Sequence, residues 1–192
     1  MDAHEKAIAR TKGTAIIEIV KALRGIEDAA ARLVPEKLQH YLTESLLPTK
    51  WYPEEDYKAL LIILGTIIAP RIPGNVWEYF GEQGAARDLS GVYAGVADYY
   101  KSDPWTALLR MGRLWPLYRN TGRVEVIRLG PGKAQILLHD YAGSCPEVCG
   151  TTTGYIRHLL VLSGAKDVEV TLLNAPPPHL GPSEWSIKFR TE

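Results

Sequence analysis

The order of hydrophobic and polar positions predicts helices in the first half of the chain. Residues 14–23 are apolar at mixed spacing, which fits a helix or a strand. A short helix is expected at 27–33. Another is expected from Pro35 through Tyr41, because proline is tolerated at the first position of a helix.

A longer helix is predicted after Pro53. Acidic residues occupy positions 54–56, which fall in its first turn, where the helix dipole favours anions. Apolar residues then recur at helical spacing: Tyr57, Leu60, Leu61, Leu64 and Ile68. Pro70 and Pro73 are expected to end this helix, because proline lacks the backbone donor that continues it.

A second long helix is predicted over 75–100, where large apolar residues recur at three- or four-residue steps within each half. It contains Gly81, Gly84, Gly91 and Gly95, and each glycine costs about 1 kcal/mol of helix stability relative to alanine. The glycines either break the helix near Gly84 or let another backbone or a ligand approach closely. We favour close helix packing.

A third helix is predicted from the Ser-Asp-Pro cap at 102–104 to about Tyr118, with Pro116 near its end. After Gly122 the period changes to two. Residues 123–129 and 134–141 form two extended runs joined by a Gly-Pro-Gly-Lys turn, which is a hairpin signal.

A helix over 151–163, ended by Gly164, separates this hairpin from two further strands, at about 168–172 and 185–189. The order of elements predicts a single α+β domain over 1–192. Its helical part is expected at 1–121 and its ββαββ part at 122–192.

Charge and length narrow the class of protein. The chain has 192 residues, and its 22 Lys and Arg balance 22 Asp and Glu. This balance argues against a nucleic-acid partner. The longest apolar run, 59–69, is shorter than the roughly 18 residues of a membrane span, and no apolar signal segment opens the chain. We therefore expect a cytoplasmic protein with two reduced cysteines and no membrane span.

No catalytic or metal-binding motif is found. The five histidines lack metal-ligand spacing, and Cys145 and Cys149 form a Cys-x3-Cys pair without a second pair to complete four ligands. Cys149 lies ahead of the predicted helix, where a thiol pKa is lowered, so it is reactive, a metal ligand or a small packed hydrophobe. We favour packing. An enzyme that uses Cys149 with His139 or His158 ranks behind the non-enzymatic hypotheses.

The aromatic residues are the better lead. The chain has five Trp and ten Tyr but only two Phe, and most of these Trp and Tyr residues lie between Trp51 and Tyr118. For any single residue a place in the helix core is favoured. As a set, rings that carry hydroxyl and indole donors indicate an apolar pocket or a dimer surface.

Four short segments resemble a known group of proteins. They are Trp51-Tyr52-Pro53, Phe80-Gly81, Cys149-Gly150 with Gly154, and the stretch from Gly164 to Val170. Together they resemble a myxobacterial paralogous family whose function is not established. More distantly, they are similar to the superfamily of heme-NO-binding sensors, four-vinyl-reductase domains and TRAPP-type trafficking subunits.

The resemblance implies a helical bundle packed on a four-stranded antiparallel sheet, which is built from two C-terminal hairpins with an intervening helix. It also implies an apolar ligand pocket and a dimer formed through the helices. The Tyr-x-Ser-x-Arg motif of the heme sensors is not found in this sequence. Trp185 stands in the final hairpin, where four-vinyl-reductase domains carry further cysteines. On these departures, neither heme nor zinc is expected as a cofactor.

The sequence thus predicts a non-enzymatic, sensor-like module that binds a small apolar or aromatic ligand and forms a homodimer. The alternative is a protein-interaction adaptor or dimerisation module with a vestigial pocket. We expect the following residues to line the pocket: Trp77, Tyr93, Tyr100, Trp105, Trp115 and Cys149.

Overall fold

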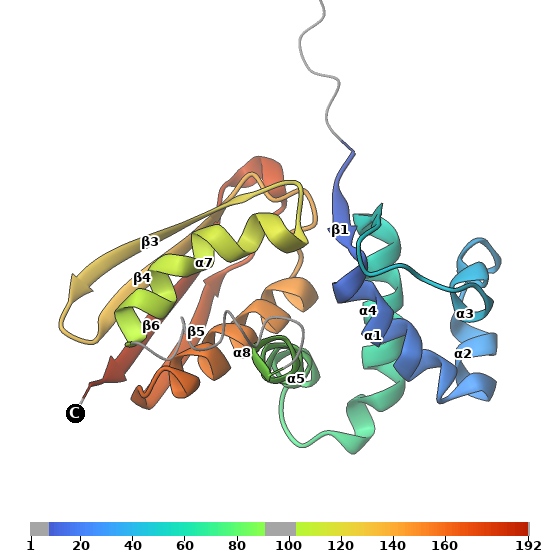
Figure 1. The fold of residues 1–192 in the computed structure, drawn as a ribbon, viewed down its shortest axis with the longest axis horizontal. Helices are drawn as coiled ribbons and strands as arrows, with labels where there is room; N and C mark the ends of the chain where they lie inside the picture. The colour runs from blue at the N-terminus through green and yellow to red at the C-terminus, as the bar shows by residue number, and fades with distance from the viewer. Residues whose placement is uncertain (1–7, 91–102, 192) are drawn as a thin grey trace, which may run out of the picture.

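The computed structural model describes residues 8–90 and 103–191. Figure 1 shows a sheet with helices α7 and α8 packed on it, then α5, and finally a group of N-terminal helices on the far side of α5. The expected α+β architecture is therefore confirmed.

The N-terminal group contains α1 (Gly13–Arg24), α2 (Glu27–Leu33), α3 (His40–Thr43) and α4 (Glu54–Ile68), with short 3-10 turns at Glu36–Leu38 and Ala69–Arg71. The ambiguous segment 14–23 is thus a helix. Its buried residues recur at three- and four-residue steps: Ile16, Ile19, Val20 and Leu23.

Two short strands, β1 (Arg10–Lys12) and β2 (Trp51–Pro53), pair antiparallel ahead of α1 and α4. The hydrophobic pattern did not predict them. Each has three residues, which is too few for an alternating pattern to be recognised. Their pairing joins segments about forty residues apart, so only the tertiary structure brings them together.

Helix α5 (Val76–Ser90) runs through Gly84 without a break, so the interpretation of a break at that position was wrong. Close packing is found instead at Gly81, where an added Cβ would collide with the Thr151 carbonyl of α8. Gly154 of α8 meets the Glu78 carbonyl of α5 in the same way. Residues 91–102 of the predicted helix, with Gly91 and Gly95, lie outside the described residues.

The four-stranded antiparallel sheet contains β3 (Arg123–Gly130), β4 (Lys133–His139), β5 (Lys166–Asn174) and β6 (Ser183–Arg190), in the order β3-β4-β6-β5. The two predicted hairpins therefore pair through β4 and β6 at the centre of the sheet. Alternate residues of β6 are buried: Ser183, Trp185, Ile187 and Phe189.

The sheet is covered by α7 (Pro104–Tyr118) and α8 (Pro146–Leu162), and a 3-10 turn at Pro178–Leu180 connects β5 to β6. Helix α7 begins at the predicted cap, where the Asp103 carboxylate accepts a bond from the Thr106 amide at 3.0 Å. Helix α8 begins at Pro146, earlier than the predicted residue 151, because proline suits a first helical position. Cys149 consequently lies inside the helix rather than ahead of it.

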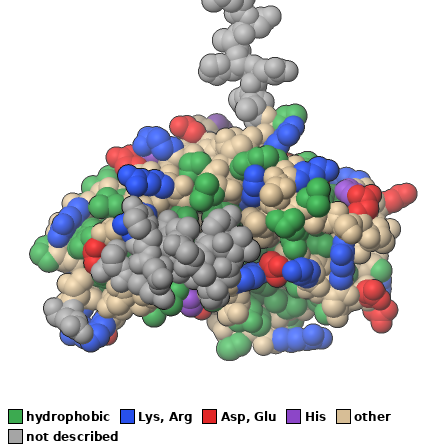
Figure 2. Space-filling view, viewed as in Figure 1, with side chains coloured by type: hydrophobic (Ala, Val, Ile, Leu, Met, Phe, Trp, Pro, Cys, Tyr) green, Lys and Arg blue, Asp and Glu red, His purple; other side chains and the backbone are tan. Residues whose placement is uncertain are grey.

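The face of the molecule in Figure 2 carries basic and acidic side chains interspersed, in keeping with the zero net charge. Within the described residues, no single helix has the length and hydrophobicity to cross a membrane. One helix pair, Glu54–Arg71 with Val76–Asp88, meets both requirements jointly but is bent by 106°.

The contact between α5 and α8 predicts opposite effects for two glycines of the same helix. Gly81→Ala should lower the free energy of unfolding by about 1–3 kcal/mol, because its methyl group collides with backbone. Gly84→Ala should raise it by about 0.5–1 kcal/mol, since a Cβ there meets nothing within 4 Å and alanine is the better helix former. Urea denaturation measures both. Equal effects at the two positions would contradict the packing described.

Candidate functional site

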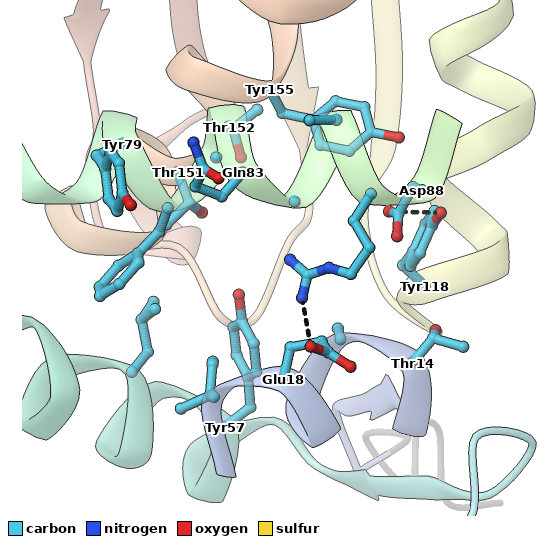
Figure 3. Close-up of a pocket in the computed structure, with 18 of the residues that line it drawn as sticks. Thr14, Glu18, Tyr57, Tyr79, Gln83, Asp88, Tyr118, Thr151, Thr152 and Tyr155 are labelled. Carbon is cyan, nitrogen blue, oxygen red and sulfur yellow. Dashed lines mark hydrogen bonds and ion pairs between the residues drawn. The ribbon is translucent and has the colours of Figure 1, made fainter. Parts of the chain in front are cut away.

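A cavity of about 840 Å³ lies between the N-terminal helices and the helices that cover the sheet. Figure 3 shows α4 and α1 on one side of it and α5 on the other. Its wall is built from α1, α4, α5, α7 and α8, and is formed by these residues: Thr14, Ala15, Glu18, Ile19, Lys21, Ala22, Tyr57, Leu61, Leu64, Ile68, Tyr79, Phe80, Gly81, Gln83, Gly84, Ala86, Arg87, Asp88, Met111, Leu114, Trp115, Tyr118, Arg119, Thr151, Thr152 and Tyr155.

Helix α5 explains why space remains here. Its glycine contact and the ion pairs of Arg157 with Glu78 and Glu82, at 2.6 and 3.0 Å, hold it against α8. On the cavity side Gly84 has no side chain to extend toward α1 and α4. The absence of a side chain at this position therefore contributes to the volume of the cavity.

Tyr57 of α4 is a buried polar residue of the cavity wall. In Figure 3 its ring stands up from α4 and its hydroxyl points into the space below α5. Burial raises the pKa of this hydroxyl, with the nearby Arg119 charge opposing the rise, so the group stays protonated at neutral pH. The Arg119 guanidinium lies 4.4 Å from the centroid of the same ring.

A buried polar network lies behind Tyr57. Arg119 Nε is 3.4 Å from the Glu54 carboxylate, and the two side chains are 9% and 1% exposed. Arg119 also donates to the Tyr141 hydroxyl at 3.1 Å and to the Thr11 hydroxyl, while Tyr141 donates to Glu54. These residues come from β1, α4, the end of α7 and the loop before α8, so the network joins both sides of the cavity.

Two polar contacts lie at the edge of the cavity, at consecutive positions of α5. Arg87 forms an ion pair with Glu18 of α1 at 2.9 Å, and this contact is a dashed line in Figure 3. Asp88 accepts a hydrogen bond from the Tyr118 hydroxyl of α7 at 2.8 Å. Glu18 also binds Lys21 at 2.9 Å. The end of α5 is thereby attached to both α1 and α7.

The structure places the sequence-predicted pocket residues in different surroundings. Trp115 lines the cavity, and its indole donates to the Thr121 carbonyl at 2.9 Å. Trp77 packs against Phe80 and the two glycines Gly65 and Gly150, outside the cavity wall.

Trp105 packs edge-on against Phe189, with ring centroids 5.2 Å apart, and Cys149 lies 3.4 Å from the Ser183 hydroxyl. Neither belongs to the cavity wall. Burial raises the pKa of the Cys149 thiol. Tyr93 and Tyr100 lie outside the described residues. Contact of any predicted residue with a ligand stays a prediction.

Sequence reasoning missed the charged residues of the site. The position of Glu54 in a first helical turn predicts only an interaction with the helix dipole. In the structure its carboxylate is buried and forms an ion pair with Arg119. Arg87 and Glu18 lie on different helices and are 69 positions apart in the sequence, so no local pattern links them. Within the described residues, no group of three or more His, Cys, Asp or Glu side chains could hold a metal ion.

No protein-family model and no curated protein matches the chain. Solved structures of H-NOX domains do match its fold. An Fe(II) unliganded mutant from K. algicida has a TM-score of 0.66 at 13% identity, covering 94% of this chain and 97% of that one. A mutant from T. tengcongensis gives 0.63 at 13% identity, with 94% and 98% covered.

An oxygen-binding H-NOX domain related to soluble guanylate cyclases, solved as its oxygen complex, gives 0.62 at 11% identity, with 94% and 95% covered. A structure solved to probe heme distortion in the H-NOX family gives 0.65 at 11% identity, with the same coverage. This protein therefore has the fold of an H-NOX domain, which confirms the expected heme-NO-binding-like architecture. The closer resemblance to a myxobacterial family stays a prediction.

The expectation that no cofactor binds, with heme set aside, was wrong. It depended on the missing Tyr-x-Ser-x-Arg motif. The overall fold is nevertheless shared, over 94% of the chain, with domains that were studied for their heme and in an Fe(II) state.

The buried network predicts strong coupling between Glu54 and Arg119. Glu54→Gln and Arg119→Met should each lower the free energy of unfolding by about 3–5 kcal/mol, because each leaves a buried charge without its counter-charge. The double variant should cost less than the sum of the two. Chemical denaturation of all four proteins completes the cycle.

The exposed pair of Lys188 and Glu169, with side chains 61% and 65% exposed, serves as the control. Lys188→Met should change the free energy of unfolding by less than about 1 kcal/mol. Additive effects of the two buried substitutions would refute the coupling.

Asp88 predicts a pH dependence of stability. Burial raises its pKa, and the Tyr118 hydrogen bond only partly offsets this. Because the folded state then binds the proton more tightly than the unfolded state, its stability falls as the pH rises through the folded pKa. Asp88→Asn should make the pH profile flatter and stabilise the protein at neutral pH. Tyr118→Phe should make it steeper. Urea midpoints from pH 3 to 8 test both, and a profile unchanged by Asp88→Asn would contradict this assignment.

Proposed function

We propose that this protein is a ligand-binding, sensor-type module whose cavity holds a flat, largely apolar molecule, with heme as the first candidate. The cavity of about 840 Å³ is the observation that supports this proposal. Sites for small molecules and cofactors commonly enclose about 300–1,000 Å³, with mostly apolar walls and a few polar groups that orient the ligand. The wall described above has this composition.

Heme fits the size and character of this cavity, and the side chains present limit how its iron would be held. Protein ligands of heme iron are His, Cys, Met or Tyr. The described part of the wall contains no His or Cys, but it contains Met111 and the tyrosines Tyr57, Tyr79, Tyr118 and Tyr155. Among the described residues of the wall, these are the side chains that could hold the iron. Bound iron would supply a site for a diatomic gas such as oxygen.

The position of the cavity supports a sensing role. It lies where the N-terminal helices meet α5, and the two sides are joined around it by polar contacts. A ligand held there contacts α1, α4, α5 and α8 together, so its presence affects how these helices are arranged. In the alternative, an adaptor with a vestigial pocket, the cavity would have no occupant.

Dimerisation is a separate proposal. The homodimer expected from the family resemblance stays a prediction, and light scattering of the purified chain tests it. A dimeric protein that binds none of the probes named below would favour the adaptor function.

The proposal predicts that filling the cavity prevents binding. Gly84→Phe should place a ring in the cavity, because Gly84 belongs to the wall and no described atom lies within 4 Å of a Cβ added there. The wild-type protein should bind hemin and metal-free protoporphyrin IX, and Gly84→Phe should weaken both by at least about tenfold, roughly 1.4 kcal/mol. Visible absorption follows hemin and fluorescence follows the porphyrin.

Gly84→Ala is the matched control and should retain binding. Thermal denaturation shows whether Gly84→Phe stays folded. Binding of the porphyrin but not of hemin would indicate a cavity without an iron ligand. Binding that is equal in wild type and a folded Gly84→Phe variant would falsify a ligand site in this cavity.

A further inference from the structure

The charged residues at the edge of the cavity indicate the chemical class of ligand that it binds. The wall is mostly apolar and includes Leu61, Leu64 and Ile68 of α4 and Phe80 of α5. Arg87, Glu18 and Lys21 are also wall residues, but they remain in contact with solvent, with side chains 42%, 33% and 65% exposed. A ligand that fills the cavity therefore meets apolar groups inside and charged groups at one edge.

One carboxylate at this edge is shared by two cations. Glu18 Oε2 lies 2.9 Å from Arg87, while its Oε1 lies 2.9 Å from Lys21. Burial would raise the pKa of Glu18, but the bonds from Lys21 and Arg87 outweigh this and lower it, so Glu18 is ionised at neutral pH. The second carboxylate of the edge, Asp88, accepts its hydrogen bond from the uncharged Tyr118 hydroxyl.

This arrangement allows an incoming anion to replace Glu18 at Arg87 while every charged group keeps a counter-ion. Glu18 would keep Lys21, and Arg87 would bind the anion through its planar guanidinium, whose donors match the two oxygens of a carboxylate. The third cation of the wall, Arg119, is already bound to Glu54 and lies 8% exposed behind Tyr57. Arg87 is thus the cation positioned for exchange.

Resting on the function proposed above, we infer that the cavity takes an apolar molecule that carries a carboxylate, which binds Arg87 in place of Glu18. The chemistry is shared by porphyrins with acidic side chains and by long-chain fatty acids. Because Arg87 belongs to α5 and Glu18 to α1, the exchange also removes an ion pair that joins these helices. Occupation of the cavity is thereby coupled to the contact between the two sides of the molecule.

Two acid and ester pairs test the inference. Protoporphyrin IX is compared with its dimethyl ester, and cis-parinaric acid with its methyl ester, by fluorescence titration of the full chain. The wild-type protein should bind the acid of the preferred pair about fivefold to tenfold more tightly than its ester. The pair that binds shows whether the carboxylate comes from a porphyrin or a fatty acid.

Variants then assign the preference to Arg87. Arg87→Gln should weaken the acid about fivefold to tenfold and leave the ester unchanged. Arg87→Lys should retain part of the preference. Glu18→Gln should strengthen the acid, because it removes the competing carboxylate, again without affecting the ester. A merely structural role of the ion pair would change acid and ester alike. Lys21→Gln should also weaken the acid, though less than Arg87→Gln, because Glu18 then has no cation left once the acid takes Arg87. Lys188→Gln, in the exposed ion pair of the sheet, is the control and should leave acid and ester binding unchanged.

The failures of the two proposals are distinguishable. Equal binding of acids and esters to the wild type, or equal weakening of both by Arg87→Gln, overturns the carboxylate inference and leaves the cavity function standing. Absence of binding by all four probes overturns the cavity function and this inference with it.

Discussion

The buried contact between Glu54 and Arg119 holds the two sides of this molecule together. Removing two charges from water is costly, and the ion pair alone does not offset that cost. The structure supplies further hydrogen bonds from Tyr141 and to Thr11, so most of the polar atoms buried here have partners. Because these partners come from four separate segments, the network is complete only when the N-terminal helices and the sheet are correctly placed. The cavity lies next to this network, and Arg119 is part of its wall.

Helix α5 is held differently on its two sides. Against α8 it makes backbone-close contact at Gly81 and Gly154, which tolerates little displacement. Toward α1 it is held across the cavity by the solvent-exposed ion pair of Arg87 and Glu18, which is weak and exchangeable. A ligand in the cavity would therefore act on the weaker side, and the α5–α8 contact would remain unchanged. This asymmetry is the physical basis for proposing a sensor rather than a rigid carrier.

Local patterns predicted the elements well where they were long and periodic. The helix after Pro53, the cap at Asp103 and the two hairpins lie close to their expected positions. The errors have local causes. The paired strands β1 and β2 are too short for a period to show, and Pro146 starts α8 five residues before the expected position. Of the aromatic residues expected in the pocket, Trp115 lies in the cavity wall, whereas Trp77 and Trp105 pack against neighbouring side chains outside it.

The sequence by itself determined the α+β architecture, because hydrophobic periods of 3.6 and 2 residues are properties of neighbouring positions. Only the tertiary structure decided which charged residues form the site. Glu18 and Arg87, or Glu54 and Arg119, meet through pairing and packing between distant segments. It also decided the roles of two glycines in one helix, since Gly81 faces a backbone and Gly84 faces the cavity. Both glycines lie within α5, and the difference arises from what packs against each.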